Sequence, residues 1–295
     1  MSVQSLAPAK VNLFLHVGPP GDDGFHPICS WMTFADVGDR ITAYESDALE
    51  VKLSGPFGAA LAHEPNNLVL RAARALLGKA KGPQRPFGLM LEKSLPVAAG
   101  LGGGSSDAGA TLRLLREALS LDLDDAALEA LAAELGADGA ACLWGMPAIA
   151  EGRGEKLSPA PAAPLMDAVL VNPMEPAPTA KVYARLDELR SWGDVERPPL
   201  PEGLETAAEV AGFLSLTRND LELAAIDVAP AVGDVLDFLR NEPESLIARM
   251  SGSGASCFAL CGSDYEAESL AERIEALRPN WWVRRCRLGA PELRA

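Results

Sequence analysis

Four glycines within the five residues 100–104 constrain this chain more than any other feature of its sequence. Ser105 and Ser106 follow directly, and apolar residues then recur at the spacing of a helix. A backbone without Cβ atoms can approach an anion closely and turn its N–H groups toward it. A helix that begins just after the loop adds its unpaired first-turn N–H groups and the positive end of its dipole. The pattern therefore predicts a cradle for a polyphosphate. The residues expected to form it are Pro96, Val97, Ala98, Ala99, Gly100, Leu101, Gly102, Gly103, Gly104, Ser105 and Ser106.

Two familiar glycine motifs do not fit this stretch. The Walker A motif requires a lysine and then Ser or Thr after its last glycine, whereas Ser105 follows Gly104 here. The dinucleotide fingerprint G-x-G-x-x-G also fails, because Ser105 occupies the third glycine position after Gly100 and Gly102. An ordinary flexible turn is the alternative, but each glycine costs about 0.5–1 kcal/mol relative to alanine in ordered structure. Four glycines are more than such a turn needs.

The overall composition indicates a globular protein and argues against some partners. With 295 residues the chain suits two domains or one large domain, and 48% of its residues are hydrophobic. The net charge of −15 argues against nucleic acid and against an anionic membrane, because both favour a basic surface. A bound polyphosphate would therefore need individual lysines close to the glycine loop.

We expect a cytoplasmic protein. Residues 1–5 show no basic start followed by an apolar run, and no stretch approaches the roughly 18 continuous apolar residues of a membrane span. The five cysteines are scattered without a C-x-x-C pair, which is typical of free buried thiols in a reducing compartment. The three histidines form no cluster with metal-ligand spacing, so no metal site made by protein ligands is expected.

The first half of the chain alternates between strand and helix patterns. Residues 9–17 predict a strand with Lys10 and Asn12 on the same face, and a hairpin turn follows at Asp23-Gly24. Further strands are expected through 31–34, 40–44 and 87–91, and helices over 67–77 and 124–135. Gly136 stands where a left-handed C-cap is expected. Asp138 would then lie in a short irregular joint.

The second half mixes strands and helices without regular β-α repetition, which favours the α+β class. Strands are expected at 168–171, 256–260 and 282–288, and helices around 180–190, 219–226, 230–240 and 265–277. A proline-rich segment at 158–164 is the best candidate for a linker. We therefore expect domains at 1–157 and 158–295. A second glycine turn, at 251–254, either borders the bound phosphate or substrate or shapes a turn.

Five ordered motifs resemble the GHMP kinase superfamily, and they extend over nearly the whole chain. They are residues 7–13, with Lys10 and Asn12, then 23–26, 96–108, 135–138 and 251–254. The resemblance implies the two-domain α+β fold of these kinases. Its N-terminal nucleotide domain is like the second domain of ribosomal protein S5, and its C-terminal domain is a ferredoxin-like α/β sandwich.

The resemblance also implies an activity and a donor site. The implied reaction is ATP-dependent phosphorylation of a small-molecule alcohol, with Mg²⁺ entering together with the nucleotide. Asp138 would accept the proton of the substrate hydroxyl, and Lys10 would hold that carboxylate ionised and counter charge on the transferred group. Lys93 would lie near the adenine or the phosphates, or else be a solvated lysine. Asn67 would contact the adenine.

Within the superfamily the match is closest to a branch whose substrate is a methylerythritol unit carrying a cytidine diphosphate group, phosphorylated on its 2-hydroxyl during isoprenoid precursor synthesis. Phe25 and His26 would recognise the cytosine by stacking and hydrogen bonding, or His26 is an ordinary surface histidine. Asn12 and Thr179 would also face the substrate. The family usually has tyrosine where this chain has Phe25.

Two further departures concern the site. Gly139-Ala140-Ala141 follow Asp138 where the family usually has Val-Pro-Phe or similar residues, which predicts a looser joint around the base. Pro27 follows His26 and restricts it to extended conformations. Two alternatives therefore stay open. One is a kinase of another GHMP branch, and the other is a catalytically weak nucleotide-binding relative. A monomer or a homodimer is expected.

Overall fold

The computed structural model describes residues 3–64, 67–80 and 86–293. Within these ranges ten strands form one sheet, in the order β3-β4-β2-β10-β7-β9-β8, with β1 and β5 also pairing with β2 and β6 pairing with β5. The strands are β1 (Val3–Val17), β2 (Ile28–Glu45), β3 (Glu50–Ser54), β4 (Phe87–Glu92), β5 (Ala148–Gly152), β6 (Lys156–Pro159), β7 (Met166–Asn172), β8 (Ile247–Met250), β9 (Cys257–Leu260) and β10 (Trp282–Gly289).

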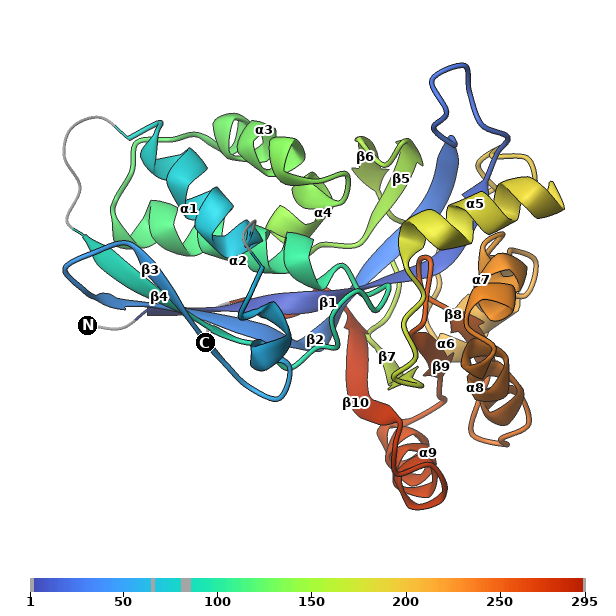
Figure 1. The fold of residues 1–295 in the computed structure, drawn as a ribbon. Helices are drawn as coiled ribbons and strands as arrows, with labels where there is room; N and C mark the ends of the chain where they lie inside the picture. The colour runs from blue at the N-terminus through green and yellow to red at the C-terminus, as the bar shows by residue number, and fades with distance from the viewer. Residues whose placement is uncertain (1–2, 65–66, 81–85, 294–295) are drawn as a thin grey trace.

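The helices fall into two groups (Figure 1). The first group covers the sheet near β1, β2 and β4 and consists of α1 (Leu68–Leu77), α2 (Gly103–Ala118), α3 (Asp125–Leu135) and α4 (Gly139–Trp144), with a short 3-10 helix, η1, at Gly58–Leu61. The second group consists of α5 (Thr179–Leu189), α6 (Ala207–Leu214), α7 (Glu222–Val228), α8 (Ala231–Arg240) and α9 (Asp264–Leu277). This mixture confirms the α+β class expected from the sequence.

The longest strands, β1 and β2, pair antiparallel and run beneath both groups of helices (Figure 1). The two strands expected at 31–34 and 40–44 are therefore one strand, and that expectation was wrong. A glycine such as Gly38 between two apolar stretches is typical of a turn. Here it lies where β2 approaches β1 so closely that a Cβ would be 2.7 Å from the Pro8 Cα. The glycine permits a close approach and does not end the strand.

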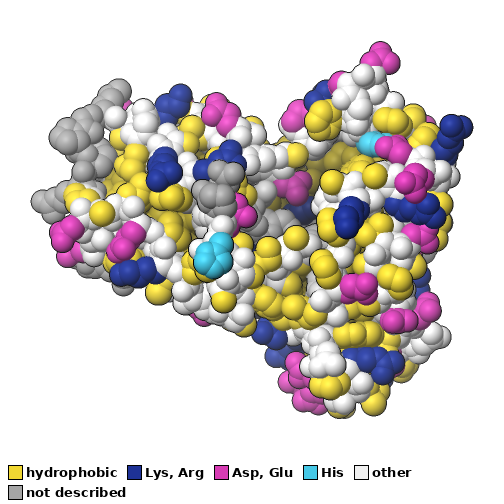
Figure 2. All heavy atoms as spheres, in the orientation of Figure 1, with side chains coloured by type: hydrophobic (Ala, Val, Ile, Leu, Met, Phe, Trp, Pro, Cys, Tyr) yellow, Lys and Arg dark blue, Asp and Glu magenta, His cyan; other side chains and the backbone are white. Residues whose placement is uncertain are grey.

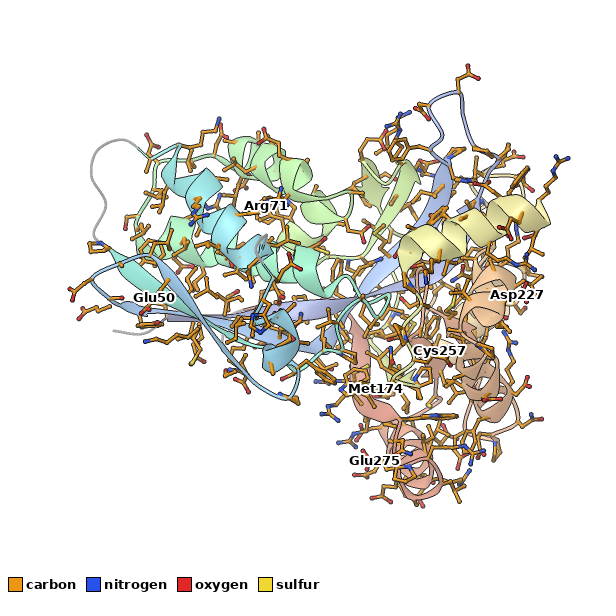
Figure 3. All side chains as sticks on the ribbon, viewed as in Figure 1. Glu50, Arg71, Met174, Asp227, Cys257 and Glu275 are labelled. Atoms are coloured by element: carbon orange, nitrogen blue, oxygen red, sulfur yellow. The ribbon has the colours of Figure 1, made fainter. Side chains whose placement is uncertain are left out.

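Apolar side chains fill the space between the sheet and each helix group. One buried cluster joins α1, α2, α3 and β4, with Leu76, Leu89 and Leu115 among its fully buried members. Another joins α5, α7, α8 and α9 to β7 and β9, and Figure 3 shows Cys257 there, between the sheet and the helices. All five cysteines are free and buried, as the sequence predicted.

Several elements were placed well by the sequence, and others were missed. The structure confirms the helices α1, α3, α5 and α9 and the strands β4, β7, β9 and β10 within one to three residues. The strands β3, β5, β6 and β8 and the helices α4 and α6 were not predicted. Gly136 is extended, with φ 171°, so the expected left-handed C-cap is also wrong.

The predicted linker at 158–164 begins inside β6, which pairs with β5. The sheet also continues across the expected domain boundary, because β10 pairs with β2 through Leu288 and Ala35. The boundary between residues 157 and 158 stays a prediction. In the part of the chain that the structure describes, no helix combines the length and the apolar character needed to cross a membrane.

Candidate active site

The glycine loop connects β4 to α2 and lies in the middle of the molecule, between the α1–α4 layer and α5 (Figure 1). Space-filling atoms show a hollow between these two parts (Figure 2). Helix α2 begins at Gly103, inside the glycine run, and its first hydrogen bond runs from the Ser106 N–H to the Gly102 carbonyl at 2.9 Å. The N–H groups of Gly103, Gly104 and Ser105 precede that bond and are the donors that a helix leaves open.

Two glycines of the loop have backbone conformations that favour glycine. Gly100 and Gly102 have φ of 75° and 62°, in the left-handed region. A Cβ on Gly100 would also lie 2.8 Å from the Gly254 carbonyl oxygen. The loop therefore depends on these glycines both for its path and for its contact with the second glycine turn.

Not every residue expected in the cradle faces outward. The Ser106 side chain is fully buried, and its N–H is used within α2. The structure places Ser106 inside the fold, whereas Ser105 is half-buried at the start of the helix. The side chains of Leu101 and Ala99 are also buried, so these residues offer the cradle backbone atoms.

Lys10 and Asp138 form an ion pair beside the loop. The Lys10 Nζ lies 3.1 Å from the Asp138 Oδ2, with 6% and 30% of the two side chains exposed. The Lys10 N–H donates to the Leu101 carbonyl at 2.8 Å, and a Cβ on Gly102 would lie 3.1 Å from the Lys10 Cε. The structure thus brings together the glycine loop, the lysine and the carboxylate that the sequence singled out.

Asp138 is the N-cap residue of α4, a helix that the sequence analysis missed. Gly139, Ala140 and Ala141 form the first turn of this helix. That the joint around Asp138 is looser than in the family stays a prediction. A Cβ on Gly139 would collide with the Ala132 carbonyl of α3. The absence of a side chain at Gly139 therefore allows α4 to pack closely on α3.

Asn12 holds the Lys10 side chain. Its Oδ1 accepts from the Lys10 Nζ at 2.6 Å, and its Nδ2 donates to the Ser30 Oγ at 2.7 Å. Asn12 is 2% exposed. Asn12 faces Lys10 as the strand pattern predicted, and its amide is fully engaged by protein atoms.

The second glycine turn packs against the loop. The Ser251 Oγ accepts from the Asn12 N–H at 3.1 Å and donates to the Gly100 carbonyl at 3.0 Å. The Thr179 Oγ1 lies 2.8 Å from the Ser253 Oγ, which joins the start of α5 to the same turn. Sequence reasoning missed the role of Ser251 as a bridge, because the serine of a glycine-rich turn carries no separate signal.

Lys93 is buried beneath the start of α2 and is not solvated. Its Nζ donates to the Asp39 Oδ2 and, at 2.9 Å, to the Asp107 Oδ2. Asp39 also accepts from the N–H groups of Ser94 and Leu95 through its Oδ1. Burial disfavours the charged lysine, but the Asp107 and Asp39 carboxylates outweigh it and raise the pKa of Lys93. A Cβ on Gly103 would lie 2.9 Å from the Lys93 Nζ, so this charge lies directly under the cradle.

Asn67 caps the other helix that meets the loop. Its side-chain oxygen accepts from the Val69 N–H at 2.9 Å, as expected for the N-cap of α1. A Cβ on Gly104 would lie 3.0 Å from the Leu68 Cδ1. Asn67 therefore lies close to the cradle, and its side-chain oxygen is already used to cap α1.

Phe25 and His26 lie in the hairpin between β1 and β2, beside α5 (Figure 1). The Phe25 side chain is exposed, and the Arg153 guanidinium lies 4.3 Å from its ring centre. His26 is buried, so it is not an ordinary surface histidine. Its Nδ1 is 2.7 Å from the Gly18 carbonyl and its Nε2 is 3.2 Å from the Asp187 Oδ1. A hydrogen bond from this imidazole to a base would require one of these contacts to break.

Comparisons with known proteins agree with this geometry. Models described as GHMP kinases N terminal domain and GHMP kinases C terminal match residues 67–146 and 202–280. A 4-diphosphocytidyl-2-C-methyl-D-erythritol kinase from a Caulobacter species is 59% identical over 292 residues, which cover 99% of this chain and 100% of the relative. The chain belongs to this family of GHMP kinases. A relative of the same name from Hyphomonas neptunium is 45% identical, over 98% of this chain and 97% of its own length.

Solved structures support the same assignment. A crystal structure of 4-(cytidine 5'-diphospho)-2C-methyl-D-erythritol kinase superposes with a TM-score of 0.78 at 33% identity, covering 97% of this chain and 99% of the other. The homoserine kinase from Cytophaga hutchinsonii superposes with a TM-score of 0.68 at 18% identity, covering 98% and 96% of the chains, and shares the fold. The family resemblance read from the five motifs is confirmed, as is the GHMP kinase fold. GHMP kinases use ATP as the phosphate donor.

Proposed function

We propose that this chain transfers the γ-phosphoryl group of ATP to the 2-hydroxyl of 4-diphosphocytidyl-2-C-methyl-D-erythritol, using Lys10 and Asp138. The observation that carries the proposal is the Lys10–Asp138 ion pair, held at 3.1 Å against the glycine loop. The family membership of the chain supports the same reaction. We also keep the predictions of a cytoplasmic location and of a monomer or homodimer.

The donor phosphates occupy the cradle. The open N–H groups of Gly103, Gly104 and Ser105 point at the anion, and the α2 dipole favours its negative charge. Lys10 and the N-terminus of α2 are the local positive features that an acidic protein needs there, and Lys93 balances the acidic groups buried beneath them. The Asn67 segment, next to Gly104, borders the adenine.

Phosphoryl transfer needs positioning and charge stabilisation more than covalent help. The Asp138 carboxylate accepts the proton of the 2-hydroxyl as that oxygen bonds to the γ-phosphorus, and the bond to the β-phosphate oxygen breaks. Lys10 pairs with the Asp138 carboxylate and offsets negative charge on the transferred group. Asn12 fixes the Lys10 ammonium, so it orients the cation and does not itself need to touch the substrate.

The acceptor lies toward the β1–β2 hairpin and α5. The exposed Phe25 ring stacks on the cytosine. The neighbouring His26 contacts Gly18 and, in α5, Asp187, and these contacts hold the hairpin backbone that carries Phe25 against α5. Thr179, at the start of α5, borders the substrate together with the glycine turn.

Mg²⁺ enters bound to the nucleotide. The described ranges hold no group of three or more His, Cys, Asp or Glu side chains that could enclose a metal ion. The Ser105 hydroxyl at the start of α2 and the Asp138 carboxylate at the start of α4 offer oxygen ligands next to the cradle, and a Cβ on Gly136 would lie 3.4 Å from the Ser105 Oγ. These oxygens fit a magnesium ion that takes most of its ligands from phosphates and water. When bound, the ion neutralises phosphate charge.

An assay of ATP consumption across a substrate panel tests the proposal. The panel contains 4-diphosphocytidyl-2-C-methyl-D-erythritol, homoserine and mevalonate. We expect turnover of the cytidine compound alone, with one ADP formed for each phosphorylated product. Turnover of homoserine without the cytidine compound would replace the proposal with another GHMP activity. ATP binding without turnover of any substrate would support a catalytically weak relative.

A further inference from the structure

Arg113 has no place in the reaction described above, yet it connects all three elements that form the site. It lies on α2, well after the helix leaves the glycine loop. Its Nη1 donates to the carbonyl oxygens of Leu143 and, at 3.2 Å, Cys142, both in α4. Its Nη2 donates to the Leu6 carbonyl of β1 at 2.9 Å. One guanidinium thus joins α2, α4 and β1.

Each of the three elements also carries one part of the site. Helix α2 begins in the cradle, α4 begins at Asp138, and β1 carries Lys10 four residues after Leu6. We infer that Arg113 is a positioning residue for phosphoryl transfer, which fixes Asp138 and Lys10 relative to the cradle by tying α2, α4 and β1 together. This inference rests on the proposed function.

The tie is close because of a glycine one turn earlier. A Cβ on Gly109 of α2 would lie 2.7 Å from the Cys142 carbonyl oxygen and 2.8 Å from the Leu143 Cα. Helices α2 and α4 therefore pack almost backbone to backbone at this point. Arg113 then satisfies carbonyl groups at the C-terminal end of α4, which a six-residue helix cannot satisfy internally.

The guanidinium keeps its charge in this environment. Burial lowers the pKa of Arg113 to about 10, which is still well above neutral pH. Without Arg113, the Cys142 and Leu143 carbonyls lose a charged donor in the interior. Helix α4 would still pack on α2 and α3, but its C-terminal end would lose the hydrogen bonds that fix it.

Arg113 acts at a distance from the reacting atoms. At about 1.5 Å of rise per residue, ten helical residues place it on the order of 15 Å along α2 from Gly103. The same rise puts Asp138 about 7 Å along α4 from Leu143. A small tilt of α4 therefore moves Asp138, and a displacement of about 1 Å can cost on the order of a hundredfold in rate.

The test compares Arg113→Met with Arg116→Met. Both arginines lie on α2, but Arg116 pairs with Asp125 of α3 at the surface and lies over the Trp144 ring. Arg113→Met is expected to lower kcat on the cytidine substrate by at least about tenfold and to change the KM for ATP less than threefold, while Arg116→Met leaves both within twofold. A kcat for Arg113→Met equal to that of Arg116→Met would overturn the inference.

Loss of stability is separated from loss of positioning in two ways. Leu239→Ala removes a core side chain from the buried face of α8 and lowers the melting temperature, but it should retain kcat at an assay temperature where it is folded. Millimolar guanidinium should restore part of the kcat of Arg113→Ala and leave the kcat of Leu239→Ala unchanged. If Arg113→Met does not fold, Arg113→Lys replaces it. Lysine can reach one of the two partner elements, so a several-fold lower kcat supports the inference and a wild-type kcat refutes it.

A readout without catalysis distinguishes failure of this inference from failure of the proposed function. Amide hydrogen exchange in residues 139–143, which exclude the Trp144 that Arg116 contacts, should accelerate in Arg113→Met and stay unchanged in Arg116→Met, whichever substrate the wild-type chain uses. A wild-type chain that phosphorylates none of the panel would refute the proposed function, and unchanged exchange in α4 would refute the tie.

Discussion

The Lys93 ammonium lies 2.9 Å from the Asp107 carboxylate in the interior beneath the glycine loop. Asp39 contacts the same ammonium from the opposite element, β2. Lys93 is at the end of β4, and Asp107 is in the second turn of α2, so the pair spans the loop from beneath. The lysine therefore keeps the acidic groups around it from leaving uncompensated negative charge beneath the cradle.

Replacing Lys93 by Met should weaken ATP binding. The buried Asp39 carboxylate would then lie without a cation under an anion cradle, and we expect the KM for ATP to rise at least about tenfold with a smaller change in kcat. Steady-state kinetics at saturating cytidine substrate measure this split. The double variant Lys93→Met with Asp39→Asn should recover part of the loss. An unchanged KM for ATP in Lys93→Met would contradict the role of this charge.

Asp107 should make the stability of the fold depend on pH. Burial raises the pKa of Asp107 to about 8, whereas an unfolded aspartate titrates near 4. Between about pH 4 and pH 8 the folded chain holds a proton that the unfolded chain releases, so this contribution to stability falls as pH rises. Asp107→Asn removes this titrating group. The difference in melting temperature, variant minus parent, should therefore be larger at pH 8.5 than at pH 5.

The control for this pH dependence is Asp47→Asn, an exposed carboxylate, which should differ from the parent by the same amount at both pH values. If Asp107→Asn behaves like Asp47→Asn, then Asp107 is not protonated in the folded chain at pH 5–8 and the argument from burial fails.

Gly139→Val should displace the catalytic carboxylate. The added side chain would collide with the Ala132 carbonyl, so α4 must move away from α3 and Asp138 must move with it. We expect kcat to fall on the order of a hundredfold if the shift is about 1 Å. Ala140→Val places the same side chain one residue later, at a half-buried position, and should be milder. Equal kcat values for the two variants would show that the close packing of α3 and α4 does not position Asp138.

Phe25→Ala should weaken binding of the cytidine substrate only. Stacking of a base on an aromatic ring contributes about 1–3 kcal/mol, which corresponds to roughly 5- to 150-fold in KM. The KM for ATP should stay within twofold, because Phe25 belongs to the β1–β2 hairpin and not to the cradle. Phe25→Tyr keeps the ring and should keep the KM. A cytidine substrate KM that is unchanged in Phe25→Ala would remove the ring from base recognition.

The sequence was most informative where one local segment makes the feature. The glycine run predicted the cradle, and the alternation in residues 9–17 placed Lys10 and Asn12 on one face, where the structure has them in contact. Asn67 at the start of a periodic segment is the N-cap of α1. These signals depend on spacing within one element, which a single sequence displays directly.

The rest depends on contacts between distant segments. The pairing of Lys93 with Asp39 joins residues 54 positions apart, and nothing local distinguishes Lys93 from a solvated lysine. Gly139-Ala140-Ala141 lack a recognisable helix start, so α4 emerges only from its packing on α2 and α3. Gly38 likewise resembles a turn residue, because a tight turn and a close approach of two strands both require glycine.

The central claim is that Asp138 accepts the proton of the substrate hydroxyl while paired with Lys10. The most direct test is kcat for Asp138→Asn on 4-diphosphocytidyl-2-C-methyl-D-erythritol, with Glu134→Gln on the exposed side of α3 as the control. Asparagine keeps the shape and can still cap α4, so the fold and the KM for ATP should be retained. The account predicts a loss of at least about 100-fold, the lower range for a general base. A kcat within twofold of the Glu134→Gln value would contradict it.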